Sequence, residues 1–366
     1  MSILIFILVL AVLILVHELG HFFAAKSADV RVDEFGLGFP PTAASWKPEN
    51  SETTYSLNWI PFGGFVKIVG EDGEEGAAVD PRSMQAKGTF TKIWLLSAGV
   101  IFNFLLAWVL ISISFMTGLP TSVTSTTAGV IGTPMTTLIE VVPESAAELA
   151  GLKAGDEIVY LELPQSTDRL EAPTVEEVQE FVGARAGEPF TLGYQRGDEV
   201  AAVEVIPTEN PETGRGMIGV GLDMIGLVKL PPHVALAEGL RSTIQFTGAI
   251  AVGLVSFIAD AFTGSADFSQ VAGPVGIAGL VGDAASRGIV ALLSFTALIS
   301  LNLAVLNLLP FPALDGGRIL FVIIEAIKGS PIKAKTSQII NTIGFGFLIL
   351  LMLVVTVSDV VKLFGN

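Results

Sequence analysis

Residues 3–21 read ILIFILVLAVLILVHELGH, and this stretch decides the class of protein. Every residue from Ile3 to Val16 is apolar, and with its flanks the run is long enough to cross a membrane as a helix. It ends in HELGH at 17–21, which holds two of the chain's three histidines. Positions i and i+4 share one helix face, so both imidazoles can bind one zinc ion, with Glu18 as general base toward water. The stretch predicts a hydrolytic metal site inside a membrane.

The alternative is a signal anchor that carries polar residues where it leaves the membrane. Such a segment is expected to begin with basic residues and to contain a small-residue cleavage site. The first basic residue is Lys26, and nothing resembling Ala-x-Ala precedes the motif. A Glu and two His in lipid are also costly unless they act together, which favours the metal site.

The rest of the composition is typical of a polytopic membrane protein. Hydrophobic residues make up 51% of the chain and charged residues 15%. Four apolar stretches, uncharged apart from Glu18 in the first, are long enough to span a bilayer: 2–25, 93–119, 289–314 and 336–358. A fifth, 242–259, is weaker because it carries Ser, Thr, Gln and several Gly. We therefore expect a polytopic α-helical membrane protein with about four transmembrane helices.

The net charge of −16 is concentrated in the middle of the chain, where 120–230 holds eighteen acidic and six basic residues. Alternating strand-like runs and Gly/Pro turns predict an inserted soluble α+β domain there. Its acidity argues against nucleic acid or anionic lipid as a partner. The chain has no cysteine, which excludes thiol catalysis and disulfides.

Charge also predicts the topology. The connection between the last two spans holds Arg318, Lys328, Lys333 and Lys335, so the positive-inside rule places it in the cytoplasm. Counting spans backwards places the acidic domain outside the cytoplasm and the HELGH end of the first helix on the cytoplasmic side.

The best candidate for a third metal ligand is Asp315, in the stretch NLLPFPALDGG at 307–317. Two prolines end the preceding helix, and two glycines let backbone approach closely. The alternative role for Asp315 is to cap the next helix. If 242–259 crossed the membrane, Asp315 would face the side opposite to HELGH, so we expect 242–259 to be a surface-lying or partly inserted helix.

The chain resembles the site-2 proteases, and among them the bacterial regulator-of-sigma-E intramembrane metalloproteases. The matching segments are HELGHF at 17–22, FGLGF at 35–39, PFGGFVK at 61–67, GVIFN at 99–103, GPVGIA at 273–278 and the 307–317 motif. The resemblance implies that His17, His21 and Asp315 bind Zn²⁺ and that Glu18 is the catalytic base. It also implies that Asn307 contacts the substrate backbone.

Residues 53–69 read as a β-hairpin with an apolar tip, within PFGGFVK. The resemblance identifies it as a membrane re-entrant hairpin. A free strand edge at Gly64, Phe65 and Val66 would pair with an unfolding substrate segment. The alternative is an ordinary hairpin packed on the spans.

The middle domain resembles a PDZ module, because GLKAGDEI at 151–158 fits the G-L-x-x-G-D-x-I pattern of bacterial protease PDZ domains. The expected core is 122–210. Two roles remain open: peptide capture by strand addition, or a steric plug that excludes bulky substrates.

These readings divide the chain into four parts. Residues 1–119 hold two spans and the hairpin, 120–230 the extracytoplasmic PDZ-like domain, 231–288 a membrane-surface helix and connector, and 289–366 the last two spans.

The expected activity is zinc-dependent hydrolysis of transmembrane segments of single-span proteins, such as anti-sigma factors or remnant signal peptides, in the cytoplasmic membrane. The alternatives are a catalytically inactive PDZ scaffold and a membrane metal transporter, which would need neither Glu18 nor a PDZ domain.

Overall fold

The computed structural model describes residues 2–71, 79–123, 129–164, 169–197, 199–265 and 271–364. The chain forms two compact units, which are described separately. Unit 1 combines Met1–Ser114 with Pro232–Asn366, and unit 2 is Phe115–Pro231.

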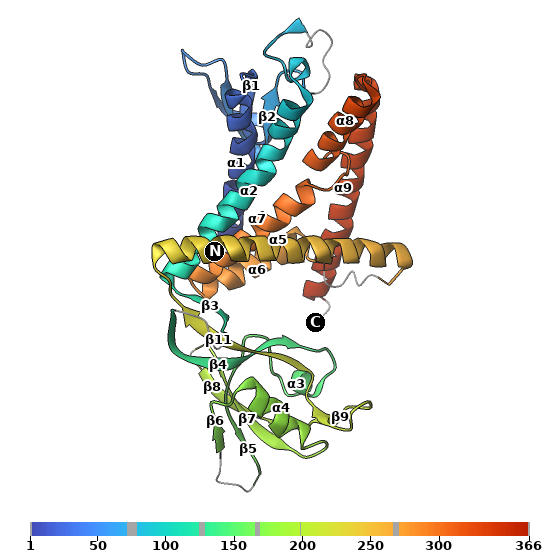
Figure 1. Cartoon of the computed structure of the whole chain (residues 1–366). Coiled ribbons are helices and arrows are strands. Elements are labelled where there is room, and N and C mark those ends of the chain that lie inside the picture. Colours follow the sequence, from blue (N-terminus) through green and yellow to red (C-terminus); the bar gives the residue numbers. More distant parts are fainter. Residues whose placement is uncertain are drawn as a thin grey trace. The chain divides into compact units, whose positions relative to one another are not determined.

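Unit 1 is mainly helical (Figure 1). Its helices are α1 (Ser2–Ser27), α2 (Thr89–Thr117, whose last residues belong to unit 2), α5 (Pro232–Thr263), α6 (Pro274–Ser286), α7 (Ile289–Asn307), α8 (Asp315–Lys328) and α9 (Ala334–Phe364), with a short 3₁₀ turn, η2, at Met84–Ala86. Five described helices are long and apolar enough to cross a membrane: α1, α2, α5, α7 and α9.

Helices occur at all five predicted apolar stretches, and two of them differ most from the predicted bounds. The stretch 289–314 is helical only as far as Asn307, because the following segment contains Pro310 and Pro312, which cannot continue the ladder of helix hydrogen bonds. The weaker stretch 242–259 is the middle of α5, a continuous helix of 32 residues.

The helices of unit 1 pack closely at small residues. A Cβ on Gly20 of α1 would lie 2.8 Å from the carbonyl carbon of Ala98 in α2, so this crossing requires glycine. Helix α5 runs crosswise to α1 and α2 in Figure 1. Trp108 of α2 donates a hydrogen bond from Nε1 to the carbonyl of Leu236 in α5 over 2.8 Å. Inside α9, the buried Asp359 accepts hydrogen bonds from two N–H groups at the start of α6, which holds α6 against α9.

The predicted hairpin over 53–69 is wrong in its pairing. Strand β2 (Thr54–Ile68) pairs with β1 (Val32–Trp46), and Gly36 of β1 lies opposite both Ser56 and Phe65. The two halves of β2 therefore lie on opposite sides of residues 34–37 and do not pair with each other. The reason is local space: a Cβ on Gly36 would lie 2.9 Å from Ser56 Oγ and would overlap the Phe65 ring, so only glycine fits between the two halves. The side chains at 61 and 62 lie outside what the structure describes.

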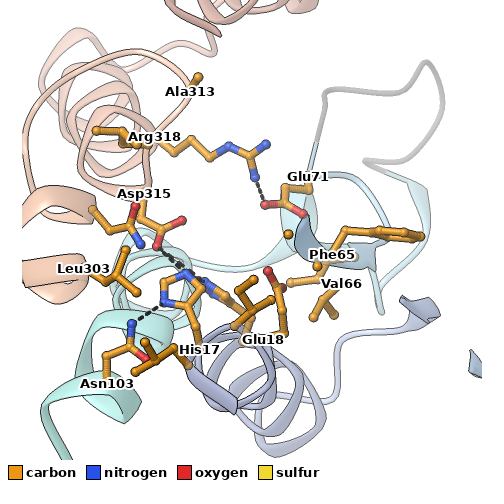
Figure 2. Close-up of a pocket in the computed structure, with 18 of the residues that line it drawn as sticks. His17, Glu18, Phe65, Val66, Glu71, Asn103, Leu303, Ala313, Asp315 and Arg318 are labelled. Carbon is orange, nitrogen blue, oxygen red and sulfur yellow. Dashed lines mark hydrogen bonds and ion pairs between the residues drawn. The ribbon is translucent and has the colours of Figure 1, made fainter. Parts of the chain in front are cut away.

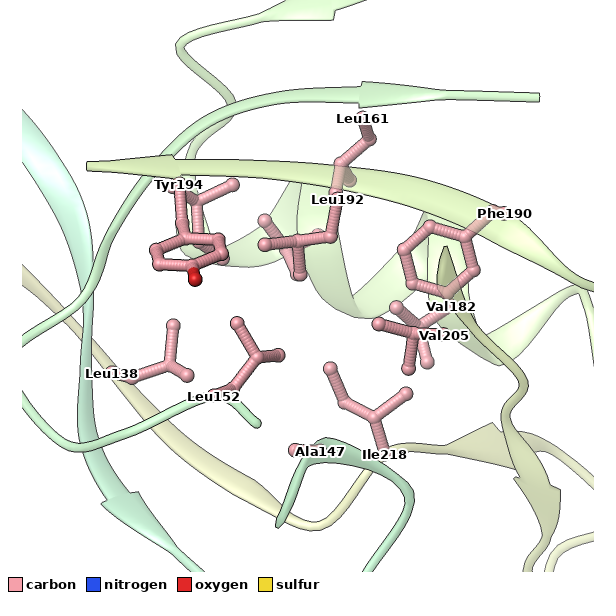
Figure 3. Close-up of a cluster of buried hydrophobic side chains, with 12 residues drawn as sticks. Leu138, Ala147, Leu152, Leu161, Val182, Phe190, Leu192, Tyr194, Val205 and Ile218 are labelled. Atoms are coloured by element: carbon pink, nitrogen blue, oxygen red, sulfur yellow. The ribbon is translucent and has the colours of Figure 1, made fainter. Parts of the chain in front are cut away.

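Unit 2 contains a seven-stranded sheet, a separate pair of strands formed by β9 and β10, and two short helices. The larger sheet has the order β3-β11-β4-β5-β7-β8, with β6 paired to β5. The elements of the unit are β3 (Leu119–Ser122), β4 (Val130–Val141), α3 (Ala146–Leu149), β5 (Glu157–Glu162), β6 (Arg169–Glu171), α4 (Val175–Gly183), β7 (Phe190–Arg196), β8 (Glu199–Val205), β9 (Thr208–Glu209), β10 (Gly216–Met217) and β11 (Val220–Val228). Figure 3 shows the apolar cluster that the sheet and α4 enclose.

The predicted core of 122–210 is too short. Ile218 is 4% exposed within the apolar cluster, and β11 pairs with β4 along nearly its whole length. The long sequence separation between β4 and β11 hid this pairing, because no local pattern announces it. Phe115–Pro231 is the compact unit, close to the predicted 120–230.

The GLKAGDEI motif has a structural role in this unit. Asp156 is 1% exposed and accepts hydrogen bonds from Nε and Nη2 of Arg196, over 2.6 and 2.7 Å, and from the Lys153 N–H over 2.8 Å. These contacts join the turn before β5 to β7 and raise the pKa of Arg196 above its ordinary value.

A groove of about 610 Å³ runs between α4 and β11. Strand β11 pairs with β4 over residues 220–228, but β3 pairs with it only over 225–228. Within the described residues, 220–223 therefore have one side without a partner strand, and residues 220–222 of this open edge line the groove.

Candidate active site

The structure brings all eight predicted site residues to one cavity of about 530 Å³ in unit 1. Helix α1 supplies three of them, the second half of β2 supplies three, and the segment from the end of α7 to the start of α8 supplies two. They are His17, Glu18, His21, Gly64, Phe65, Val66, Asn307 and Asp315. Figure 2 shows His17 and Asp315 facing each other with Glu18 beside them.

The three predicted ligands converge on one point. His17 Nε2 lies 3.2 Å from His21 Nε2 and 3.3 Å from Asp315 Oδ2, and His21 Nε2 lies 3.5 Å from the same carboxylate oxygen. Among the described residues, these three side chains form the group of ligand atoms close enough to share one ion. Two imidazoles and a carboxylate are a donor set typical of catalytic zinc.

These separations fit a tetrahedral zinc ion. Ligand atoms about 2.0–2.1 Å from such an ion lie roughly 3.3 Å from one another. Asp315 Oδ2 is buried without a hydrogen-bond partner among the described residues, so its lone pairs are available at this point. The Nδ1–H of His21 donates to the carbonyl of Leu95 over 2.9 Å, which leaves its Nε2 lone pair directed at the same place. The residues present therefore fit the metal.

Two backbone segments, one in α2 and one at the start of α8, lie so close to their neighbours at the site that only glycine fits. A Cβ on Gly99 of α2 would lie 2.6 Å from His17 Cε1, so glycine lets α2 lie directly against the imidazoles. At the start of α8, a Cβ on Gly316 or Gly317 would overlap the carbonyls of the 308–311 segment. The predicted close backbone approach at the two glycines after Asp315 is confirmed.

Glu18 lies against β2. A Cβ on Gly64 would be 2.9 Å from Glu18 Cγ and 2.8 Å from Ile14, so the strand approaches α1 as closely as backbone allows. The side of residues 64–68 away from β1 has no partner strand among the described residues, and Gly64 to Val66 line the cavity. The Glu18 carboxylate and the unpaired strand edge at residues 64–66 therefore lie side by side in the cavity.

The sequence of the chain matches Peptidase family M50 over residues 5–351. The chain belongs to family M50. This family comprises the site-2 proteases, so the chain is a zinc metalloprotease with a membrane-type helical unit, as the sequence predicted.

Curated relatives agree with membership of family M50 along the whole chain. A putative zinc metalloprotease of Clostridium perfringens is 34% identical over 97% of this chain and 97% of its own length. One from a Nostoc species is 34% identical over 99% and 97%. The zinc metalloprotease RasP of Geobacillus kaustophilus is 31% identical over 99% and 98%. The solved PDZ domain of an SdrC-like protein from Listeria monocytogenes has 18% identity and a TM-score of 0.22, covering 25% of this chain and 90% of that one.

Sequence reasoning missed several residues around this M50 site. Arg318 forms an ion pair with Glu71 across the cavity lining (Figure 2), and the sequence had suggested only a topological role for Arg318. Glu71 belongs to no motif. Gly99 carried a weak signal, since the spacing Gly99-x-x-x-Asn103 places both residues on one face of α2.

Proposed function

We propose that this zinc metalloprotease hydrolyses peptide bonds within the membrane-spanning segments of single-span membrane proteins. The observation that carries the proposal is the convergence of His17 and His21 of α1 with Asp315 at the start of α8. Glu18 lies beside them on α1, an apolar helix that is long enough to span a bilayer. Ionisable groups at such depth are costly unless they act together, and a hydrolytic site gives all four a task.

Each residue has one chemical role in this proposal. His17, His21 and Asp315 hold the zinc, which when bound lowers the pKa of water to about 7 and polarises the scissile carbonyl. Glu18 accepts the proton of the attacking water and returns it to the leaving amine. Asn307, at the end of α7 in the cavity lining, donates to the backbone of the substrate.

The substrate segment pairs with the open edge at Gly64, Phe65 and Val66. A helical substrate buries its carbonyls in i→i−4 hydrogen bonds, so it must unwind before attack. Strand addition replaces the hydrogen bonds lost on unwinding and holds the segment extended beside Glu18. Segments weakened by Gly or Pro are therefore cut faster. By their single-span architecture, anti-sigma factors and remnant signal peptides are suitable natural substrates.

The function is tested with purified enzyme and a tagged single-span substrate in liposomes. Two substrates are compared, one with an all-Leu apolar segment and one with a Gly-Pro pair at its centre. Mass spectrometry is expected to place the cut within the apolar segment, faster in the second substrate, with loss on chelation and recovery on adding zinc. Cuts confined to the water-exposed tails would reject an intramembrane protease.

We infer that α1, α2, α7 and α9 cross the cytoplasmic membrane, with the zinc site toward the cytoplasm and unit 2 outside. Support comes from the basic residues from α8 to the start of α9, which are Arg318, Lys328, Lys333 and Lys335. The number of spans also places Asp315 on the same side of the membrane as His17, which it approaches in the structure. Helix α5 then lies at the membrane surface or is partly inserted, which its crosswise course and largely unburied apolar face support.

This topology predicts the labelling of single cysteines in intact cells. The chain has no native cysteine, so Ala186→Cys in unit 2 and Ser330→Cys between α8 and α9 each give one exposed thiol. A membrane-impermeant thiol reagent is expected to label the first and spare the second until the cells are broken. The reverse pattern would overturn the orientation.

Unit 2 is proposed to capture an extended peptide in the groove between α4 and β11. The open edge at 220–223 supports strand addition over a purely steric role. Gln179 of α4 is exposed and lines the groove, whereas its neighbour Glu180 is exposed and lies outside the lining. Gln179→Trp is therefore expected to weaken capture of a substrate tail at least about tenfold by filling the groove, and Glu180→Trp to leave it unchanged. Equal binding by both variants would favour the steric plug.

A further inference from the structure

Helix α2 supplies a hydrogen-bond partner to the Nδ1 atom of each of the two histidines. Leu95, Gly99 and Asn103 recur every four residues and so share one face of α2. The carbonyl of Leu95 lies 2.9 Å from His21 Nδ1, and the Asn103 amide nitrogen lies 3.3 Å from His17 Nδ1. Gly99, between them, leaves the space that the imidazoles occupy.

The two partners differ chemically. A backbone carbonyl only accepts, so Leu95 fixes the proton of neutral His21 on Nδ1 and leaves Nε2 free for a metal. His17 needs the same tautomer, because its Nε2 also points at Asp315. Its Nδ1–H must then meet an acceptor, and of the two amide atoms of Asn103 only Oδ1 accepts.

The surroundings of Asn103 favour this role. The side chain is fully buried at 0% exposure, and its Oδ1 has no hydrogen-bond partner within the part of the chain that the structure describes. Its backbone carbonyl accepts a hydrogen bond from Ser300 Oγ of α7 over 2.8 Å, which fixes the residue against the helix that leads to Asn307. A half-turn of the amide exchanges Oδ1 and Nδ2, and Oδ1 then faces His17 Nδ1.

We propose that Asn103 is a positioning residue for zinc binding: its Oδ1 accepts the Nδ1–H of His17 and so directs the Nε2 lone pair of His17 at the metal. The proposal rests on the proposed ligand set and adds a residue that touches neither zinc nor substrate. The competing role is interhelical packing alone, in which a buried amide only joins α2 to α1.

Three variants separate positioning from packing. Asn103→Leu keeps the branched shape of the side chain but removes the acceptor, whereas Asn103→Asp keeps both the shape and the acceptor. Asn302→Leu on α7 is the control, because this exposed amide donates to the Leu298 carbonyl of its own helix and lies outside the lining of the cavity. The readout is zinc affinity of the full chain in detergent, measured by competition with a chromogenic chelator, and thermal unfolding without metal checks that each variant folds.

Loss of an outer hydrogen-bond partner typically weakens metal binding about 10–100-fold. We expect this loss for Asn103→Leu, near-normal affinity for Asn103→Asp, and no change for Asn302→Leu. Unchanged affinity of Asn103→Leu, or equal losses in the Leu and Asp variants, would overturn the positioning role. Asp315→Asn is measured in parallel: if it binds zinc as tightly as the unchanged protein, the ligand set itself fails. If it loses zinc while Asn103→Leu does not, only the positioning role fails.

Discussion

Glu18→Gln is expected to lower proteolysis by about 10²–10⁴-fold while zinc content stays at the wild-type level. The Gln side chain has almost the shape of Glu but cannot take a proton from water. Glu18 lies in the cavity beside His17 and packs against Gly64, so the substitution keeps these contacts. Initial rates on the single-span substrate and metal analysis of the purified variant give the two values.

Glu238→Gln is the matched control, because Glu238 is on α5, outside the cavity lining, and its carboxylate forms an ion pair with Arg241 over 3.8 Å. It is expected to cleave at the normal rate. If Glu18→Gln turned over within about tenfold of wild type, another group would perform the proton transfer and the assigned base would be wrong.

Asp315→Ala is expected to weaken zinc binding by more than about 100-fold, which exceeds the typical effect of losing an outer partner. The substitution removes one of three ligands and leaves two imidazole nitrogens 3.2 Å apart without the carboxylate beside them. Asp315→Asn should also lose zinc, because a neutral amide is a poorer ligand than a carboxylate. Zinc is measured by metal analysis after dialysis against a weak chelator.

Asp283→Ala provides the comparison, since Asp283 is an exposed acid of α6 that lies outside the cavity lining. It should retain wild-type zinc. Full zinc content in Asp315→Ala, or in the double variant His17→Ala/His21→Ala, would show that the metal is held elsewhere.

The site was predictable from the sequence where its residues follow short-range rules. His17 and His21 are one helical turn apart, and Asp315 stands between helix-breaking prolines and two glycines, so local spacing was enough to select them. The apolar stretches likewise mark their helices by composition alone.

Features that depend on distant segments were not predictable in this way. Strand β1 lies between the two halves of β2, and β11 completes the sheet of unit 2 from far along the chain. The contact of Gly99 and Asn103 with the histidines depends on how closely α1 and α2 approach each other. In the sequence, only its weak spacing signal with Asn103 distinguishes Gly99 from the other glycines of the chain.

The central claim is that one zinc ion at His17, His21 and Asp315 makes this chain a protease. The most direct measurement is a titration of the metal-free enzyme with zinc, in which bound metal and cleavage of the single-span substrate are followed together. Activity is expected to rise in proportion to bound zinc and to saturate at one ion per chain, with Asp315→Asn showing neither. Cleavage by the metal-free enzyme, or saturation with zinc without any cleavage, would contradict the claim.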